Sequence, residues 1–178
     1  MFPYKYLSNS SIYVKRMSKE KEKTTRRTSR YHQGRFKPKN PEKYQGDPSQ
    51  IWFRSSWERL LMRWLDRHPS IISWGSEEIT IPYISPVDNK RHRYFPDFIV
   101  KKKSKDGSIN TVVIEVKPKK ELFPPKEPQR KGKRYLTEMA TYAVNQEKWE
   151  AAKRYCKEFG WEFVVMTEDH LFGKGKNK

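Results

Sequence analysis

The stretch that decides the fold runs from Arg93 to Lys117 and holds two strand-like runs, Tyr94-Phe95-Pro96-Asp97-Phe98-Ile99-Val100 and Thr111-Val112-Val113-Ile114-Glu115-Val116-Lys117. Side chains alternate between the two faces of a strand, so Glu115 and Lys117 share one face while Ile114 and Val116 point to the other. The apolar pair can enter a core. A carboxylate and an ammonium group then lie side by side on a half-buried surface, where an unpaired charge is costly.

The segment between these runs contains Asp106-Gly107, a common hairpin signal. If residues 105–107 form a three-residue loop with the glycine in a left-handed conformation, the register places Asp97 opposite Glu115. Opposite residues in an antiparallel pair have Cβ atoms about 4.5–5.5 Å apart, so two carboxylates there repel unless a cation sits between them. Oxygen ligands of this kind suit Mg²⁺ or Mn²⁺. The alternative is a different register, with both acids at the solvated edge of an ordinary hairpin.

The composition indicates one domain with an extension, and a polyanionic partner. The 178 residues fit a domain of ordinary size with some chain to spare. A net charge of +18 favours polyanions, and nucleic acid is the commonest of these for an intracellular protein. An anionic membrane or an acidic protein partner would explain the charge equally well.

The apolar residues and the single cysteine disfavour membrane-spanning, secreted and disulfide-stabilised proteins. No apolar run approaches the ~20 residues that span a bilayer. The N-terminus carries no apolar core of a signal peptide, so we expect a protein that is not secreted. Cys156 alone can form neither an internal disulfide nor a multi-cysteine zinc site, and we expect it to be a buried thiol on a helix.

The first 46 residues form a basic arm, with thirteen Lys and Arg against three Glu. Because the arm has few aliphatic residues to bury, we expect it to be extended or ordered by a partner. Phosphate contact is the favoured interpretation and a solvated tail the alternative. The candidate phosphate contacts are Arg26, Arg27, Arg30, Arg35 and Lys37. Met17 offers a second start codon, so residues 1–16 could reflect an upstream start. After the arm, we expect the folded domain at 47–170 and a basic tail at 171–178.

The first elements are predicted from apolar periodicity and turn residues. A helix is expected to begin near residues 55–56, with Glu58 in its first turn, and to end at His68-Pro69. At this position Glu58 either compensates the helix dipole or points along the docked edge toward the strands. Residues 79–84 predict the first strand, with Pro82 at an edge or bulge, and together with the two runs above they predict an antiparallel meander.

The second half of the chain predicts a crossover. A proline-rich connection at 118–134 is expected to be exposed and not helical. A helix is predicted over 136–159, with a break considered near Asn145 and a stop at Gly160. A strand at 161–166 completes the crossover. The predicted fold is α/β, in the order αβββαβ, with a mixed central sheet flanked by helices.

Charged residues on three of these elements resemble the pattern of one nuclease superfamily. Glu58 on the first helix, Pro96-Asp97 on the second strand and Glu115-Val116-Lys117 on the third resemble the PD-(D/E)XK nucleases. The resemblance implies a restriction-endonuclease-like core with Glu58, Asp97, Glu115 and Lys117 as catalytic residues. It also implies that Asp97, Glu115 and the backbone carbonyl of Val116 hold Mg²⁺ or Mn²⁺, with Glu58 as a further candidate ligand.

Motifs outside this set carry a narrower resemblance, to the head completion nucleases of T-even-like tailed phages. These motifs are Gly34-Arg35-Phe36-Lys37-Pro38, Tyr44-Gln45-Gly46-Asp47, Arg54-Ser55-Ser56-Trp57-Glu58, Ser85-Pro86-Val87-Asp88-Asn89 and Arg93-Tyr94-Phe95-Pro96-Asp97-Phe98. The resemblance implies action on double-stranded DNA, in the host cytoplasm during assembly or in the virion head or neck, with portal, neck or capsid proteins as partners. The core is also similar to the catalytic domain of the transposase endonuclease subunit of heteromeric transposons, whose additional C-terminal domain we do not expect here.

Basic residues flank the predicted centre and can position a DNA backbone without reading its bases. These candidate DNA contacts are Arg54, Arg91, His92, Arg93, Lys119 and Lys120. We interpret His92 as a surface or stacking histidine rather than a catalytic base. Arg54 is interpreted as a salt-bridge or phosphate residue near Glu58.

The sequence thus predicts a Mg²⁺-dependent DNA endonuclease or end-trimming nuclease that acts in phage head completion after DNA packaging. The alternative is a structural head or portal-associated DNA-binding protein that retains the nuclease fold without cleavage. The complete set of three acids and a lysine favours the enzyme, because decay of a site usually removes one of its members. An RNA-binding module is poorly supported, since no aromatic platform motif is present.

Overall fold

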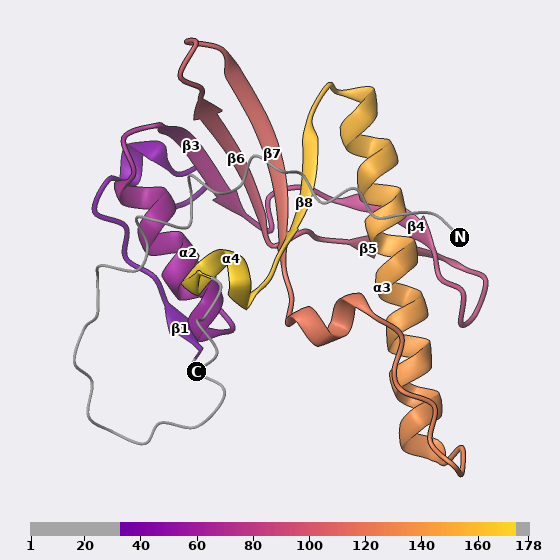
Figure 1. Cartoon of the computed structure of the whole chain (residues 1–178). Helices are drawn as coiled ribbons and strands as arrows, with labels where there is room; N and C mark the ends of the chain where they lie inside the picture. Colours follow the sequence, from indigo (N-terminus) through magenta and orange to yellow (C-terminus); the bar gives the residue numbers. More distant parts are fainter. Residues whose placement is uncertain (1–32, 174–178) are drawn as a thin grey trace, which may run out of the picture.

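A four-stranded sheet forms the centre of the molecule (Figure 1). The structure is a computed structural model that describes residues 33–173, so the arm at 1–32 and the tail at 174–178 lie outside the described residues. The sheet consists of β3 (Ile71–Ser76), β6 (Phe98–Lys103), β7 (Ile109–Val116) and β8 (Glu162–Met166), in the order β3-β6-β7-β8. The first three strands are antiparallel, whereas β8 is parallel to β7. The predicted α/β fold with a mixed central sheet is confirmed.

Helices lie on both faces of this sheet (Figure 1). One face carries α2 (Ser56–Arg67) and the short α4 (Glu168–Phe172), and the other carries the long α3 (Lys133–Glu158). Ile114 and Val116 of β7 pack in the same core cluster as Leu61 and Leu65 of α2. The alternation predicted for the β7 run therefore holds, and its apolar face is buried under α2.

The α3 face has its own, smaller cores. Val113 of β7 and Ile99 of β6 pack with the buried Cys156 of α3. Burial raises the pKa of the Cys156 thiol to about 11, so the thiol stays protonated and unreactive. The prediction of a buried thiol on a helix is confirmed.

The helix α2 begins and ends where its sequence predicts. The Ser55 hydroxyl accepts a hydrogen bond from the N–H of Glu58 at 3.1 Å, and the helix stops before His68. Asp66, which is buried in α2, accepts hydrogen bonds from the N–H groups of Lys39 and Asn40 at 2.9 and 3.0 Å. These bonds fix the preceding segment against the helix.

Part of the predicted basic arm is therefore folded onto the domain. Strand β1 (Gly34–Arg35) pairs antiparallel with β2 (Trp52–Phe53), and the 3₁₀ helix η1 (Pro41–Lys43) lies between them in sequence. Phe36 packs edge-on against the buried Trp74. At the other end of the chain, Leu171 of α4 is buried in the main core. The packed structure thus includes residues on both sides of 47–170.

The β6–β7 hairpin has the predicted register. Phe98 pairs with Ile114 and Lys103 with Ile109, so the ladder extrapolates to Asp97 opposite Glu115. Gly107 closes the loop with a φ of 87°, the left-handed conformation that favours glycine. The alternative register, with both acids at a solvated edge, is wrong.

The prediction that residues 79–84 form the first strand of the meander is wrong. Strand β4 (Ile81–Ile84) pairs with β5 (Arg91–Tyr94) in a separate two-stranded sheet, and β3 takes the place beside β6. The chain leaves the main sheet at Glu77, whose φ of 58° turns it away after β3. The β3 sequence, Ile-Ile-Ser-Trp-Gly-Ser, contains a glycine and two serines, which weaken its strand signal.

The break considered near Asn145 is also wrong. The helix α3 runs without interruption from Lys133 to Glu158, and Asn145 is buried within it. An asparagine costs a helix interior less than about 0.7 kcal/mol, which packing on either side easily offsets. Gly160, with a φ of 66°, ends the helix as predicted.

The proline-rich connection is largely exposed, as predicted, and contains the short 3₁₀ helix η2 (Lys119–Leu122). Its last two residues, Lys133 and Arg134, already belong to α3, which begins earlier than predicted. In the part of the chain that the structure describes, no helix is long and apolar enough to cross a membrane.

Candidate active site

The predicted catalytic residues meet at one end of the β6–β7 pair. Glu115 is the second-last residue of β7, Lys117 follows that strand, and Asp97 immediately precedes β6. Glu58 comes from the first turn of α2, and its charge acts on Asp97. Segments that are far apart in the sequence are thus brought to the same end of the two interior strands β6 and β7.

Glu115 is buried, with 4% of its surface exposed, and both of its carboxylate oxygens have partners. The hydroxyl of Tyr94 donates to Oε2 at 2.8 Å, and Lys117 Nζ lies 3.1 Å from Oε1. Tyr94 is itself 3% exposed, and burial together with the Glu115 charge raises the pKa of its hydroxyl. Tyr94 therefore remains a hydrogen-bond donor, and the carboxylate is held from two sides.

Asp97 is the carboxylate of the site whose ionisation is most disfavoured by its surroundings. Its Oδ2 accepts a hydrogen bond from the N–H of Val116 at 2.7 Å. Burial, followed by the charges of Glu115 and Glu58, raises the pKa of Asp97 to about 8, although the Val116 N–H and the Lys117 charge oppose this shift. The centre thus has more negative charge than its own lysine neutralises.

Lys117 responds to the same charges in the opposite direction. Burial alone would lower the pKa of Lys117, but the charges of Glu115 and Asp97 outweigh this effect and raise it. Lys117 is therefore an ammonium cation at neutral pH and cannot serve as a base there.

Glu58 lies at the helix start with both oxygens engaged. Its Oε2 accepts from the N–H of Arg54 at 2.8 Å, and its Oε1 accepts from the Ser55 hydroxyl at 2.8 Å. Glu58 therefore lies where its charge can compensate the dipole of α2, the structural role considered for this residue. Its charge also contributes to the raised pKa of Asp97, so Glu58 is near enough to the centre to act on it.

The donor set of this centre fits a Mg²⁺-sized ion. Within residues 33–173 no group of three or more His, Cys, Asp and Glu side chains is close enough to enclose a metal. Mg²⁺ usually binds through one or two carboxylates and keeps several waters, which matches the pair Asp97 and Glu115. A cation beside the two carboxylates would relieve the repulsion that raises the Asp97 pKa.

The structure places the predicted contacts from β5 on an exposed strand. Arg91, His92 and Arg93 line a surface hollow of about 440 Å³ with Thr80 and Pro82. The imidazole of His92 lies 2.9 Å from a carboxylate oxygen of Asp88 and the guanidinium of Arg93 lies over Phe95. His92 is therefore a surface histidine paired within its own hairpin.

Other predicted DNA contacts are paired within the protein. Arg54 forms an ion pair with Glu77, and the Lys119 ammonium lies 2.7 Å from Asp169 of α4. Lys120 and Lys37 are exposed, whereas Arg35 is held by Gln50 and Trp52 on the β1–β2 pair. Arg26, Arg27 and Arg30 lie outside the described residues.

Sequence reasoning assigned no role to two residues at this centre. Tyr94 binds Glu115, and Glu77 pairs with Arg54 while its N–H donates to the carbonyl of Asp97 at 3.2 Å. The spacing of Tyr94, three residues before Asp97, was visible, but the break between β5 and β6 hides the direction of its side chain. No sequence signal pointed to Glu77.

Comparisons with known proteins identify the family of the chain. The family model described as TnsA-like endonuclease N terminal matches residues 68–168, which include Asp97, Glu115 and Lys117. The protein described as "Head completion nuclease" of Enterobacteria phage T4 is 42% identical over 148 residues, covering 81% of this chain and 96% of that protein. No solved structure matches. The chain belongs to the TnsA-like endonuclease N-terminal family, a group of PD-(D/E)XK-type nucleases.

Proposed function

We propose that this protein is a Mg²⁺-dependent DNA endonuclease or end-trimming nuclease that acts in phage head completion after DNA packaging. The observation that carries the proposal is the buried Glu115, which shares an edge of the sheet with Asp97 and contacts Lys117 at 3.1 Å. Two carboxylates can hold the ion of a metal-assisted phosphodiester hydrolysis, and an ammonium group can stabilise the charge that develops on the phosphate.

Asp97 and Glu115 would hold the ion, together with the Val116 carbonyl expected from the family pattern and with Glu58 as a further candidate ligand. Bound Mg²⁺, or Mn²⁺ in its place, would lower the pKa of a water and screen the charge of the phosphate. The raised pKa of Asp97 supports this assignment, because a carboxylate that resists ionisation alone gains most from a cation.

The other residues of the centre position groups and stabilise charge. Lys117 is a cation at neutral pH, so it can orient a water or stabilise the charge that develops on the phosphate. Tyr94 keeps the Glu115 carboxylate in one orientation through its hydrogen bond. Tyr94 is the last residue of β5, and Lys117 directly follows β7 with its N–H donating to the carbonyl of Met166 at 2.9 Å, which favours a pre-organised site.

The DNA backbone would be held by the exposed basic side chains around the centre. Arg91 and Arg93 on β5 and Lys120 on η2 are exposed and flank Asp97 and Lys117 in the chain. Contacts of this kind position a duplex and bring little sequence preference. The arm at 1–32, with Arg26, Arg27 and Arg30, would add further phosphate contacts.

The biological setting is proposed from the phage relative. That protein is described as a head completion nuclease, and it matches over most of both chains. A nuclease of this kind would act on double-stranded DNA in the host cytoplasm during assembly or in the virion, with portal, neck or capsid proteins as partners.

Cleavage of supercoiled plasmid in the presence of Mg²⁺ tests the proposal. We expect wild-type protein to nick or linearise the plasmid, and Glu115→Ala and Lys117→Ala to lose this activity while binding DNA nearly as well. Lys105→Ala, in the hairpin loop at the far end of β6 and β7, is the matched control and should cleave normally. Circular dichroism of each variant checks its fold.

Two results would contradict the proposal. Equal nicking by wild type and by both centre variants would trace the activity to a contaminant. Clean wild-type protein that binds DNA but cuts no form of it with Mg²⁺ or Mn²⁺ would be the structural head or portal-associated DNA-binding protein instead.

A further inference from the structure

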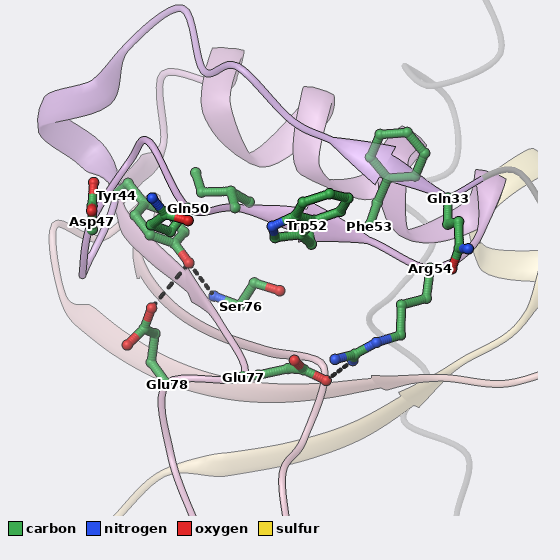
Figure 2. A pocket seen from close by; sticks show the side chains of 11 residues that line it. Gln33, Tyr44, Asp47, Gln50, Trp52, Phe53, Arg54, Ser76, Glu77 and Glu78 are labelled. Atoms are coloured by element: carbon green, nitrogen blue, oxygen red, sulfur yellow. Dashed lines mark hydrogen bonds and ion pairs between the residues drawn. The ribbon is translucent and has the colours of Figure 1, made fainter.

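A second pocket lies beside the centre and has no part in the chemistry proposed above. Its volume is about 400 Å³, within the 300–1,000 Å³ that small-molecule sites usually occupy. Figure 2 shows Gln50, Trp52 and Phe53 along one side of it and Glu77 and Glu78 along the other.

Arg54 connects this pocket with the catalytic centre. It lines the pocket and forms an ion pair with Glu77 (Figure 2). Its guanidinium also feels the charges of Glu58 and Asp97, which places both carboxylates close to the same side chain. A molecule in the pocket would therefore lie next to the position of the cleaved bond.

The most unusual residue of the pocket is Trp52, which is 54% exposed although it belongs to a strand. Its neighbour Phe53 is buried in the main core and lies opposite Gly34 in the β1–β2 ladder. A Cβ atom on Gly34 would come within 3.0 Å of the Phe53 ring, so the glycine allows the two strands to close over it. With Phe53 fixed inward, the strand alternation directs Trp52 outward.

The indole of Trp52 is also paired with a cation. The guanidinium carbon of Arg35 lies 5.6 Å from the ring centroid of Trp52. The Nη2 atom of the same guanidinium donates to Oε1 of Gln50 at 3.3 Å. An exposed aromatic face beside an arginine is the arrangement that single-stranded nucleic-acid sites use to stack a base. Such stacking tolerates any base, because every base has a π face.

The opposite wall selects a base over a phosphate. Glu77 and Glu78 are exposed carboxylates, and Asp47 also lines the pocket. The charge of Glu77 is balanced by Arg54, whereas those of Glu78 and Asp47 remain to repel a phosphate group, and a carboxylate can accept hydrogen bonds from the amino groups of bases. The pocket is thus suited to a neutral, flat ring whose phosphates stay outside.

We propose that this pocket receives one unpaired base of the DNA strand next to the cleavage site, stacked on Trp52. The protein then prefers DNA ends with a single-stranded overhang over blunt ends. The proposal deepens the nuclease function and rests on it for the identity of the ligand, but the binding that it describes needs no cleavage.

Binding measurements without metal test this proposal separately from the nuclease activity. Fluorescence anisotropy in EDTA compares a blunt DNA hairpin with the same hairpin carrying a four-nucleotide overhang. Stacking on an aromatic residue contributes about 1–3 kcal/mol per base, so we expect the overhang to bind roughly tenfold more tightly to the wild type. Trp52→Ala should remove this preference and leave the blunt-end Kd unchanged, while Trp52→Phe should keep part of it.

Two controls are needed. One distinguishes binding of the base from binding of the DNA backbone, and the other distinguishes Trp52 from exposed aromatic residues in general. Phe159→Ala, which removes an aromatic ring that is also 54% exposed, should keep the preference. An overhang of abasic nucleotides should bind to the wild type no better than the blunt hairpin. The proposal is overturned if abasic and normal overhangs bind equally well, or if Trp52→Ala weakens both DNAs by the same factor. If the wild-type protein shows the overhang preference but cuts no plasmid in Mg²⁺, only the nuclease function is overturned, and the base pocket stands.

Discussion

The carboxylate centre and the basic strand β5 show two opposite ways of using charge. At the centre, Glu115 is buried and hydrogen-bonded on both sides, and the pKa of Asp97 is raised because its neighbours repel it. On β5, Arg91 and Arg93 are exposed to solvent. Buried charges are expensive and fixed, whereas exposed charges are screened and weak. Changes at the centre should therefore act on chemistry and stability, and changes at the two exposed arginines of β5 on affinity alone.

The largest expected effect comes from Asp97→Asn. This change keeps the shape of the side chain but removes one of the two carboxylates, so plasmid cleavage should fall by at least about 100-fold. Initial rates of nicking at saturating plasmid measure the loss. If cleavage falls only as far as it does for an Arg93 variant, the distinction between the two regions breaks down.

The same variant should be more stable than the wild type when no metal is present. Between about pH 3.9, the ordinary carboxyl value, and pH 8, the folded protein keeps a proton on Asp97 that the unfolded chain has lost. The cost of this carboxyl to stability therefore grows as the pH rises through this window. Asp97→Asn should raise the Tm in EDTA by at least about 3 °C at pH 8, and by less at pH 5. An unchanged or lower Tm at pH 8 would mean that the pKa of Asp97 is not raised in the folded protein.

Mg²⁺ binding should depend on pH for the same reason. The ion must displace the proton of Asp97, so its apparent affinity should rise by up to about tenfold per pH unit from pH 6 to 8 and level off above. Calorimetric titration of the full chain at each pH measures this slope. Asp97→Asn serves as the control and should show weak binding with a flat profile. A flat profile in the wild type would assign the ion to other groups.

Tyr94→Phe tests whether the fixed orientation of Glu115 matters. Loss of a hydrogen bond to a charged group costs about 1.5–3 kcal/mol, so we expect cleavage to fall about tenfold and to require more Mg²⁺. Tyr83→Phe removes a hydroxyl from β4, the partner strand of β5, and is the matched control. Equal effects of the two changes would reduce Tyr94 to a packing residue.

The smallest effect is expected at the exposed arginines of β5. Arg93→Gln should weaken duplex binding only modestly and reduce the slope of log K against log salt by about 1, with little change in the rate at saturating DNA. Arg154→Gln, an exposed arginine on α3, controls for the change in net charge. If both variants change the slope equally, β5 has no special role and the whole basic surface acts together.

The sequence predicted the centre well because its signals are local. The Asp106-Gly107 turn fixed the hairpin register, and the register brought Asp97 to Glu115. The serine before α2 likewise fixed the place of Glu58. In each case a turn or a cap determines the geometry over a few residues.

The parts that were missed depend on contacts between distant segments. β3 joins the main sheet as the strand beside β6 because Trp74 is fully buried among residues from other elements, whereas the β3 sequence alone gives a weak strand signal. The role of Tyr94 follows from a change of direction between β5 and β6 that no local pattern records. The pocket at Trp52 arises only when β1 pairs with β2.

The detour of the chain between β3 and β6 begins and ends at one place in the sheet. Ser76 and Phe98 are paired partners, and the N–H of Glu77 donates to the carbonyl of Asp97, so the two ends of the β4–β5 excursion are joined. The excursion therefore behaves as an insertable module. Evolution or engineering can replace its tip, and with it the DNA grip of Arg91, while the register of the centre is preserved. Such an exchange has to keep Tyr94, through which the module touches Glu115, and the contacts of Ile81 and Tyr83 with α3.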